Sequence, residues 1–125
     1  MIEELWGTAL ALNYLANGWY IVGAYSEAQR CAHEALEIAT KARLVPLALE
    51  ALVTLAAVRI QNAEKETARV LLQLALQHSA STHMTKKRAQ DLLVELEPYL
   101  LPDLISGYAQ DIPRFEEIVA KELKS

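Results

Sequence analysis

The chain has 125 residues, a hydrophobic content of 53% and a formal net charge of -4 at pH 7. A chain of this length buries the core of one compact domain and hardly of two, and its acidic balance offers no broad positive field for nucleic acid. The sequence holds only 4 Gly and 4 Pro. Strong helix formers dominate and no window alternates with a period of two, so we expect an all-helical protein.

The first predicted helix covers residues 2–22, and the stretch from Leu5 to Ser26 contains no charged residue. That stretch is long enough to cross a bilayer. Two asparagines and three glycines would be costly in lipid, however, and Glu3 and Glu4 stand where a signal peptide needs lysine or arginine. A helix that is apolar on every side is normally covered from more than one direction. We therefore expect the chain to be a piece of a longer array with upstream domains, or an oligomer in which a second copy covers this helix.

A turn at Gly23 leads into the second predicted helix, which is followed by a linker over residues 40–45. Ser26 is the expected N-cap, and Gln29 would complete a capping box. The helix is amphipathic, with its apolar side formed by Ala28, Cys31, Ala32, Ala35, Leu36, Ala39 and Ala42. The single cysteine cannot form an intramolecular disulfide, so we expect a small buried residue in a protein of the reducing cytoplasm.

A second helical pair repeats the first. Pro46 suits the first turn of a third helix that ends near Gln61, and Asn62 can cap a fourth helix over residues 64–78. The apolar positions of the first pair, Leu12, Leu15, Ala16, Ala28, Ala32, Ala35 and Leu36, have counterparts in Leu52, Leu55, Ala56, Ala68, Leu72, Ala75 and Leu76. Arg59 takes the place of Trp19. Corresponding residues lie 40 positions apart.

These spacings resemble the tetratricopeptide repeat family. The resemblance rests on the ladder Leu12, Leu15, Ala16, Trp19, Tyr25, Ala28, Ala32 and Ala35. It implies a right-handed α-α superhelix of antiparallel helix pairs, in which Leu12, Leu15, Ala16 and Trp19 fill the core. The family repeat is about 34 residues long, so we expect the surplus to lengthen the second helix and the linker over residues 40–45.

The C-terminal part is expected to close the array. Ser81 or Thr82 can cap a fifth helix that reaches Glu97, where Pro98 stops it. A short helix within residues 102–107 and a last helix opened by Pro113 would hide the final apolar face. The predicted single domain, 1–125, thus divides into repeat one (5–43), a degenerate repeat two (46–78), a further helix (82–97) and a C-terminal cap (98–125).

A second resemblance concerns residues 74–96. The run Leu74-Ala75-Leu76-Gln77-His78, followed by Ala89, Leu92-Leu93 and Glu95-Leu96, is similar to the C-terminal ends of bacterial signal-transduction ATPases of the STAND type. The resemblance implies that the chain is the sensor end of such a regulator. The chain has no Gly-rich phosphate loop ending in Gly-Lys-Ser or Gly-Lys-Thr, so nucleotide chemistry would not reside in it.

The candidate binding residues lie on the first helix of each pair, which would line a concave groove. They are Trp6, Leu10, Asn13, Asn17, Tyr20, Glu50, Val53 and Ala57. Asparagines four positions apart can hold the backbone amides of an extended peptide, and the two aromatic rings offer flat apolar contact. The same face could instead be buried by an upstream helix or a second copy.

No catalytic, cofactor or metal site is predicted. The three histidines, His33, His78 and His83, lie on different segments and lack carboxylate partners with metal-site spacing. We expect a non-enzymatic module that binds a protein or peptide in its groove and binds neither nucleic acid nor membrane. The alternative is a structural module that self-assembles through its first helix.

Overall fold

The computed structural model describes residues 2–96 and 115–124. The helices in these ranges are α1 (Ile2–Ile21), α2 (Tyr25–Lys41), α3 (Val45–Gln61), α4 (Lys65–Gln77), α5 (His83–Leu96) and α7 (Phe115–Lys124). All regular structure in the described residues is helical, which confirms the predicted all-helical class. The predicted stop at Pro98 and the short helix at residues 102–107 lie outside the described residues.

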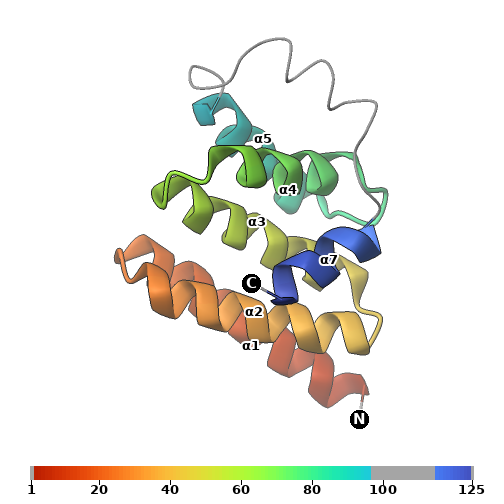
Figure 1. Ribbon diagram of the computed structural model, residues 1–125. Helices are drawn as coiled ribbons and strands as arrows, with labels where there is room; N and C mark the ends of the chain where they lie inside the picture. Colours follow the sequence, from red (N-terminus) through yellow and green to blue (C-terminus); the bar gives the residue numbers. More distant parts are fainter. Residues whose placement is uncertain (1, 97–114, 125) are drawn as a thin grey trace.

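Consecutive helices are spatial neighbours from α1 to α5 (Figure 1). In addition, α1 contacts α3 and α3 contacts α5. Helices α1, α3 and α5 therefore form one layer, and α2 and α4 form a second layer beside it. Alanines make the close contacts within the first pair, because Ala16, Ala28, Ala32 and Ala35 are all fully buried.

Three nearly identical turns join the first four helices. Gly23, Arg43 and Ala63 lie 20 residues apart and all have positive φ, of 86°, 59° and 64°. In each turn, this residue and the next donate backbone hydrogen bonds that close a Schellman motif, for example Gly23 to Tyr20 and Ala24 to Trp19. The 40-residue repeat thus comes from long helices and short turns, and the predicted lengthening of the linker over residues 40–45 is wrong.

The N-terminal caps also differ from the prediction. Ser26 and Gln29 do not form a capping box, because the last residue of the Schellman turn, Ala24, already occupies the N-cap position of α2 without a side-chain bond. Asn62 likewise caps the end of α3 and does not begin α4. The predicted cap of α5 is confirmed at Thr82, whose Oγ1 accepts a hydrogen bond of 3.1 Å from the Thr85 amide.

The predicted core of α1 is right in part. Ala16 is buried and Leu12 is half-buried, but Leu15 and Trp19 are 53% and 39% exposed. The neighbours of α1 cover one side of it, and the fully buried stripe on that side is Ala9, Asn13 and Ala16. The expectation that Leu15 and Trp19 fill the core is therefore wrong in the single chain.

The C-terminal helix α7 folds back over the array. It packs mainly against α2, and Figure 1 shows it crossing in front of α3. Its own residues Ile118 and Val119 are buried. The ring of Phe115, at the start of α7, meets the His78 ring edge-on at a centroid distance of 5.5 Å. We expected a cap that hides the last face of the array; α7 instead covers the middle.

Candidate functional site

The predicted binding residues are divided between surface and core. Trp6 is exposed, Leu10, Asn17, Tyr20 and Glu50 are half-buried, and Asn13, Val53 and Ala57 are buried. The Asn13 Nδ2 donates a hydrogen bond of 3.1 Å to the Leu47 carbonyl, which ties α1 to the first turn of α3. The Asn13 Oδ1 is buried and has no hydrogen-bond partner among the described residues. The structure therefore gives Asn13 a structural contact and leaves Trp6, Asn17 and Tyr20 on the accessible part of the face.

A polar contact between α5 and α3 lies close to Tyr20 of α1. The Arg88 guanidinium donates a hydrogen bond of 2.9 Å to the Thr54 hydroxyl. Burial lowers the pKa of Arg88, and the neighbouring Glu50 and Tyr20 oppose this effect. Burial likewise raises the pKa of Glu50, and Arg88 opposes it. Sequence reasoning missed Arg88, although its spacing from buried Thr85 places both on one side of α5.

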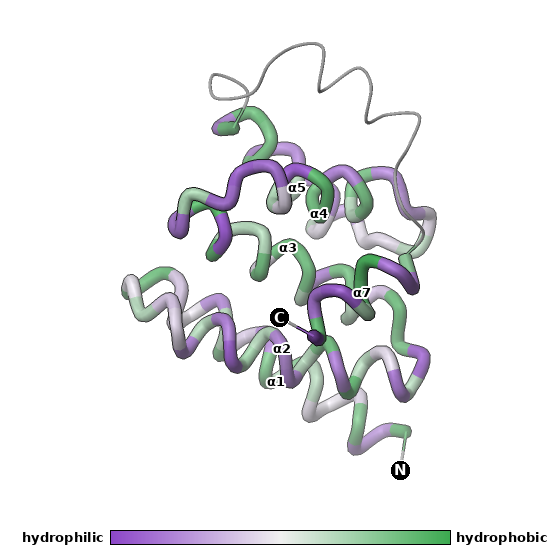
Figure 2. The backbone as a smooth tube through the Cα atoms, in the orientation of Figure 1, coloured by the Kyte–Doolittle hydropathy of each residue, from purple (hydrophilic) through white to green (hydrophobic). Residues whose placement is uncertain are grey.

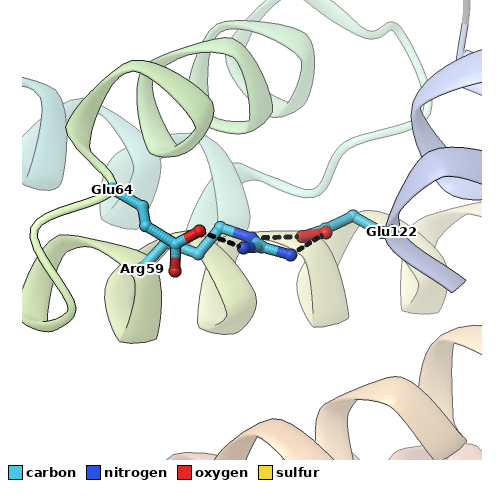
Figure 3. A network of polar contacts seen from close by, with 3 residues as sticks. All are labelled: Arg59, Glu64 and Glu122. Atoms are coloured by element: carbon cyan, nitrogen blue, oxygen red, sulfur yellow. Dashed lines mark hydrogen bonds and ion pairs between the residues drawn. The ribbon is translucent and has the colours of Figure 1, made fainter. Parts of the chain in front are cut away.

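A second charged cluster fixes α7 to α3 (Figure 3). Arg59 donates to both carboxylate oxygens of Glu122, at 2.9 Å from Nε to Oε1 and by a further bond from Nη2, and its Nη1 lies 2.8 Å from a Glu64 oxygen. The side chains of Arg59 and Glu122 are only 11% and 4% exposed. The hydrogen bonds to Glu122 raise the pKa of Arg59. The Arg59–Glu122 pair thus ties α7 to α3 by a largely buried, charge-assisted contact.

A shallow pocket of about 510 Å³ lies between α2 and α7. Its lining residues are Ser26, Gln29, Arg30, His33, Glu34, Glu37, Ile38 and Leu123. Arg30 is held at the rim by ion pairs of 2.6 Å and 3.3 Å with Glu27 and Glu34. Burial lowers the pKa of His33, and its Nε2 is buried without a hydrogen-bond partner among the described residues. The ion pairs of this pocket lie within α2, and its described side chains do not form a nucleophile–base pair.

One side of α1 has no neighbouring helix among the described residues. We define this open face as Thr8, Ala11, Leu15, Gly18 and Trp19 of α1 together with Val22, which directly follows the helix. All six are exposed. Their counterparts 40 positions on, in α3, include Ala48, Ala51, Leu55 and Val58, which are all buried. The difference arises because α3 has the pair α1 and α2 on one side and α4 and α5 on the other. The sequence indicated an all-apolar helix but not which side stays open.

Other site types find no support in the part of the chain that the structure describes. Residues 2–96 and 115–124 contain no group of three or more His, Cys, Asp or Glu side chains that could hold a metal ion. Cys31 is buried, as predicted, and burial raises the pKa of its thiol. Among the described helices, none combines the length and the apolar character that a membrane crossing requires.

Comparisons with protein-family models, with curated proteins and with solved structures gave no match. The open face and the polar clusters are therefore interpreted from their own geometry.

Proposed function

We propose that the chain is a non-enzymatic protein–protein interaction module that binds through the open face of α1. One observation carries this proposal: Leu15 is 53% exposed, whereas Leu55 at the corresponding position of α3 is 1% exposed. A contiguous exposed apolar face on a helix is typical of an interaction surface. The corresponding side of α3 is covered by helices, so the proposed partner presents a helix.

The proposal includes the tetratricopeptide-like architecture. Antiparallel pairs in two layers, equal turns 20 residues apart and a 40-residue repeat all support a solenoid that adds one pair at a time. In such an array, the open face of α1 is the surface on which a preceding pair would stack. The sensor end of a STAND-type regulator is one setting in which this module would work.

Peptide binding across α1, α3 and α5 is a second candidate function. Trp6, Asn17 and Tyr20 are accessible on α1, and Tyr20 lies near the half-buried Arg88 of α5. Because Asn13 holds α3, the test of this groove is the double variant Asn17→Ala and Tyr20→Ala. It should abolish capture of a peptide partner while circular dichroism remains unchanged. Undiminished capture would assign the binding to another surface.

Site-specific photocrosslinking tests the primary proposal. A benzophenone-bearing amino acid replaces Leu15 in one chain and Val94 in a control chain; both residues are apolar and exposed, at 53% and 60%. In extracts of the cells that produce the chain, we expect discrete protein adducts from position 15 and none from position 94. Equal labelling from both positions, or no adduct from position 15, would contradict the proposal.

A further inference from the structure

Bulky and small side chains divide α1 into two unequal halves along its open side. The small residues Gly7, Thr8 and Ala11 lie in the N-terminal half. The C-terminal half carries the bulky Leu15 and Trp19, with Val22 just after the helix, and one small residue, Gly18. If two α1 helices packed in parallel, the bulky side chains of their C-terminal halves would meet each other. In an antiparallel pair centred between Tyr14 and Leu15, each bulky half would meet a small half, which is the complementarity that close helix packing needs.

The same centre places Gly7 opposite a larger residue and Ala11 opposite the second glycine. Gly7 would face Val22 of the other helix, and Ala11 would face Gly18. Each of these pairs is symmetric about the point between Tyr14 and Leu15, as a two-fold axis requires. Contacts between Ala11 and Gly18 let the two backbones approach closely, and Tyr14 and Leu15 interlock at the centre.

The two helical glycines have no role within the single chain. A Cβ added at Gly7 or at Gly18 would meet no atom within 4 Å, and neither residue has a positive φ. Glycine is a poor helix former, so its presence at two open positions of α1 is unexplained by packing inside the chain. Close approach of a helix from another molecule explains both positions.

Charge favours a second copy over a charged partner. The helix carries no charged residue from Leu5 to its end, and each chain has a formal net charge of -4. Two like-charged molecules meet most easily on a surface without charge, because like charges brought together at an interface cost affinity.

We propose that a second copy of this chain covers the open face, with the two α1 helices antiparallel across a two-fold axis between Tyr14 and Leu15. The inference rests on the proposed function, because it names the partner of the same face. In this dimer, Leu15 becomes buried as Leu55 is in α3, and the six residues of the open face lose their contact with water.

Sedimentation equilibrium on the purified full chain tests the second copy. We expect a dimer of the 13.9 kDa chain that dissociates on dilution. Leu15→Glu places two carboxylates at the axis and should raise the dissociation constant by about 100-fold or more. Val94→Glu makes the same change at an exposed site on α5 and should leave the constant unchanged. Circular dichroism shows whether each variant is folded.

Disulfide trapping tests the direction of the helices. In a background carrying Cys31→Ala, one chain bears Gly7→Cys and another bears Val22→Cys. An antiparallel pair predicts a mixed disulfide when the two chains are combined, and little homodimeric crosslink from either chain alone. Homodimeric crosslinks in place of the mixed product would overturn the antiparallel arrangement.

The outcomes separate this inference from the proposed function. A monomer at every concentration, or a dimer insensitive to Leu15→Glu, overturns the second copy. If the chain is monomeric and position 15 still crosslinks to a different protein, the interaction module stands and only the identity of its partner changes. If position 15 gives no adduct either, both proposals fall.

Discussion

Helices α1 and α3 occupy corresponding places in successive helical pairs, yet they have opposite surroundings. Both are apolar on all sides, and Figure 2 shows α3 as largely hydrophobic along its length. From Leu47 to Arg59 every residue of α3 except Glu50 is buried, whereas α1 buries Ala9, Asn13 and Ala16. In a stacked array, the burial of a residue thus depends on the helices on either side as much as on its own helix.

Trp19 of α1 and Arg59 of α3 occupy corresponding positions and also differ in their surroundings. Trp19 is partly exposed to solvent, while Arg59 is enclosed beneath α7 and paired with Glu122. A long cationic side chain is tolerated inside α3 because a carboxylate arrives from a helix 63 residues away in sequence. The cover over α3 therefore contains a specific charge pair, whereas the open face of α1 is uncharged.

The largest effect is expected from removing that charge pair. Glu122→Gln removes the more deeply buried of the two carboxylates that pair with Arg59 and leaves Glu64 in place. Breaking a buried pair in this way costs about 3 to 5 kcal/mol of unfolding free energy. Urea denaturation measures the loss, and hydrogen exchange in α7 should rise. Glu116→Gln removes an exposed carboxylate from the same helix and serves as the control. Equal stability of the two variants would mean that α7 docks without help from Arg59.

The comparison of α1 with α3 is tested directly by matched truncations. Leu55→Ala creates a cavity in the core and should lower the free energy of unfolding by about 3 kcal/mol. Leu15→Ala removes the same atoms from the corresponding exposed site and should cost less than about 1 kcal/mol in dilute solution. Similar losses for both variants would show that Leu15 is covered within one chain.

The sequence was sufficient to predict the helices but not their surroundings. Periodicity and turn residues predicted the start of α2 and both ends of α1, α3, α4 and α5 within about two residues, because both signals are local. The exposure of Leu15, the burial of Arg88 and the docking of α7 depend on contacts between distant segments. In the sequence, Arg59 was recognised only as a departure from the repeat. The structure shows that its pairing with Glu122 accommodates a charged residue at this position.

The turns between the helices were difficult to predict for a related reason. Gly23 was recognised as a turn because glycine favours positive φ, but Arg43 and Ala63 adopt the same conformation without that preference. The Schellman hydrogen bonds and the packing of the flanking helices hold them there. A strict 20-residue spacing is the signal that links the three turns.

Substitutions in these turns should change the free energy of unfolding by less than the preceding variants, and two of them should raise it. Arg43→Gly and Ala63→Gly relieve a left-handed backbone conformation at exposed residues, so each should stabilise the fold by about 0.5 to 1 kcal/mol. Gly23→Ala should destabilise it by about 1 kcal/mol. Urea denaturation of the three single variants gives the signs. Destabilisation by Ala63→Gly would indicate that the turn is not under strain.

The smallest expected effect concerns His33 in the seam between α2 and α7. Its pKa is lowered below the ordinary 6.5, chiefly by burial, with Arg59 lowering it further and Glu122 opposing both. The unfolded chain therefore binds a proton at this residue more readily than the folded chain, so His33 withdraws stability as the pH falls below about 6.5. The N-terminal half of α1 adds no pH dependence of this kind, because the sequence has no titrating group from Leu5 to Asn13.

The variant His33→Gln isolates this contribution from those of the carboxylates, including Glu34, Glu37 and Glu122 around the same seam. Melting temperatures of the parent and the variant should differ more at pH 5 than at pH 7, with the parent losing more stability on acidification. His83→Gln changes an exposed histidine on α5 and should follow the parent curve. If His33→Gln also follows the parent curve, protonated His33 is as well solvated in the folded chain as in the unfolded chain. Helix α7 would then shield His33 from water less than it shields Arg59.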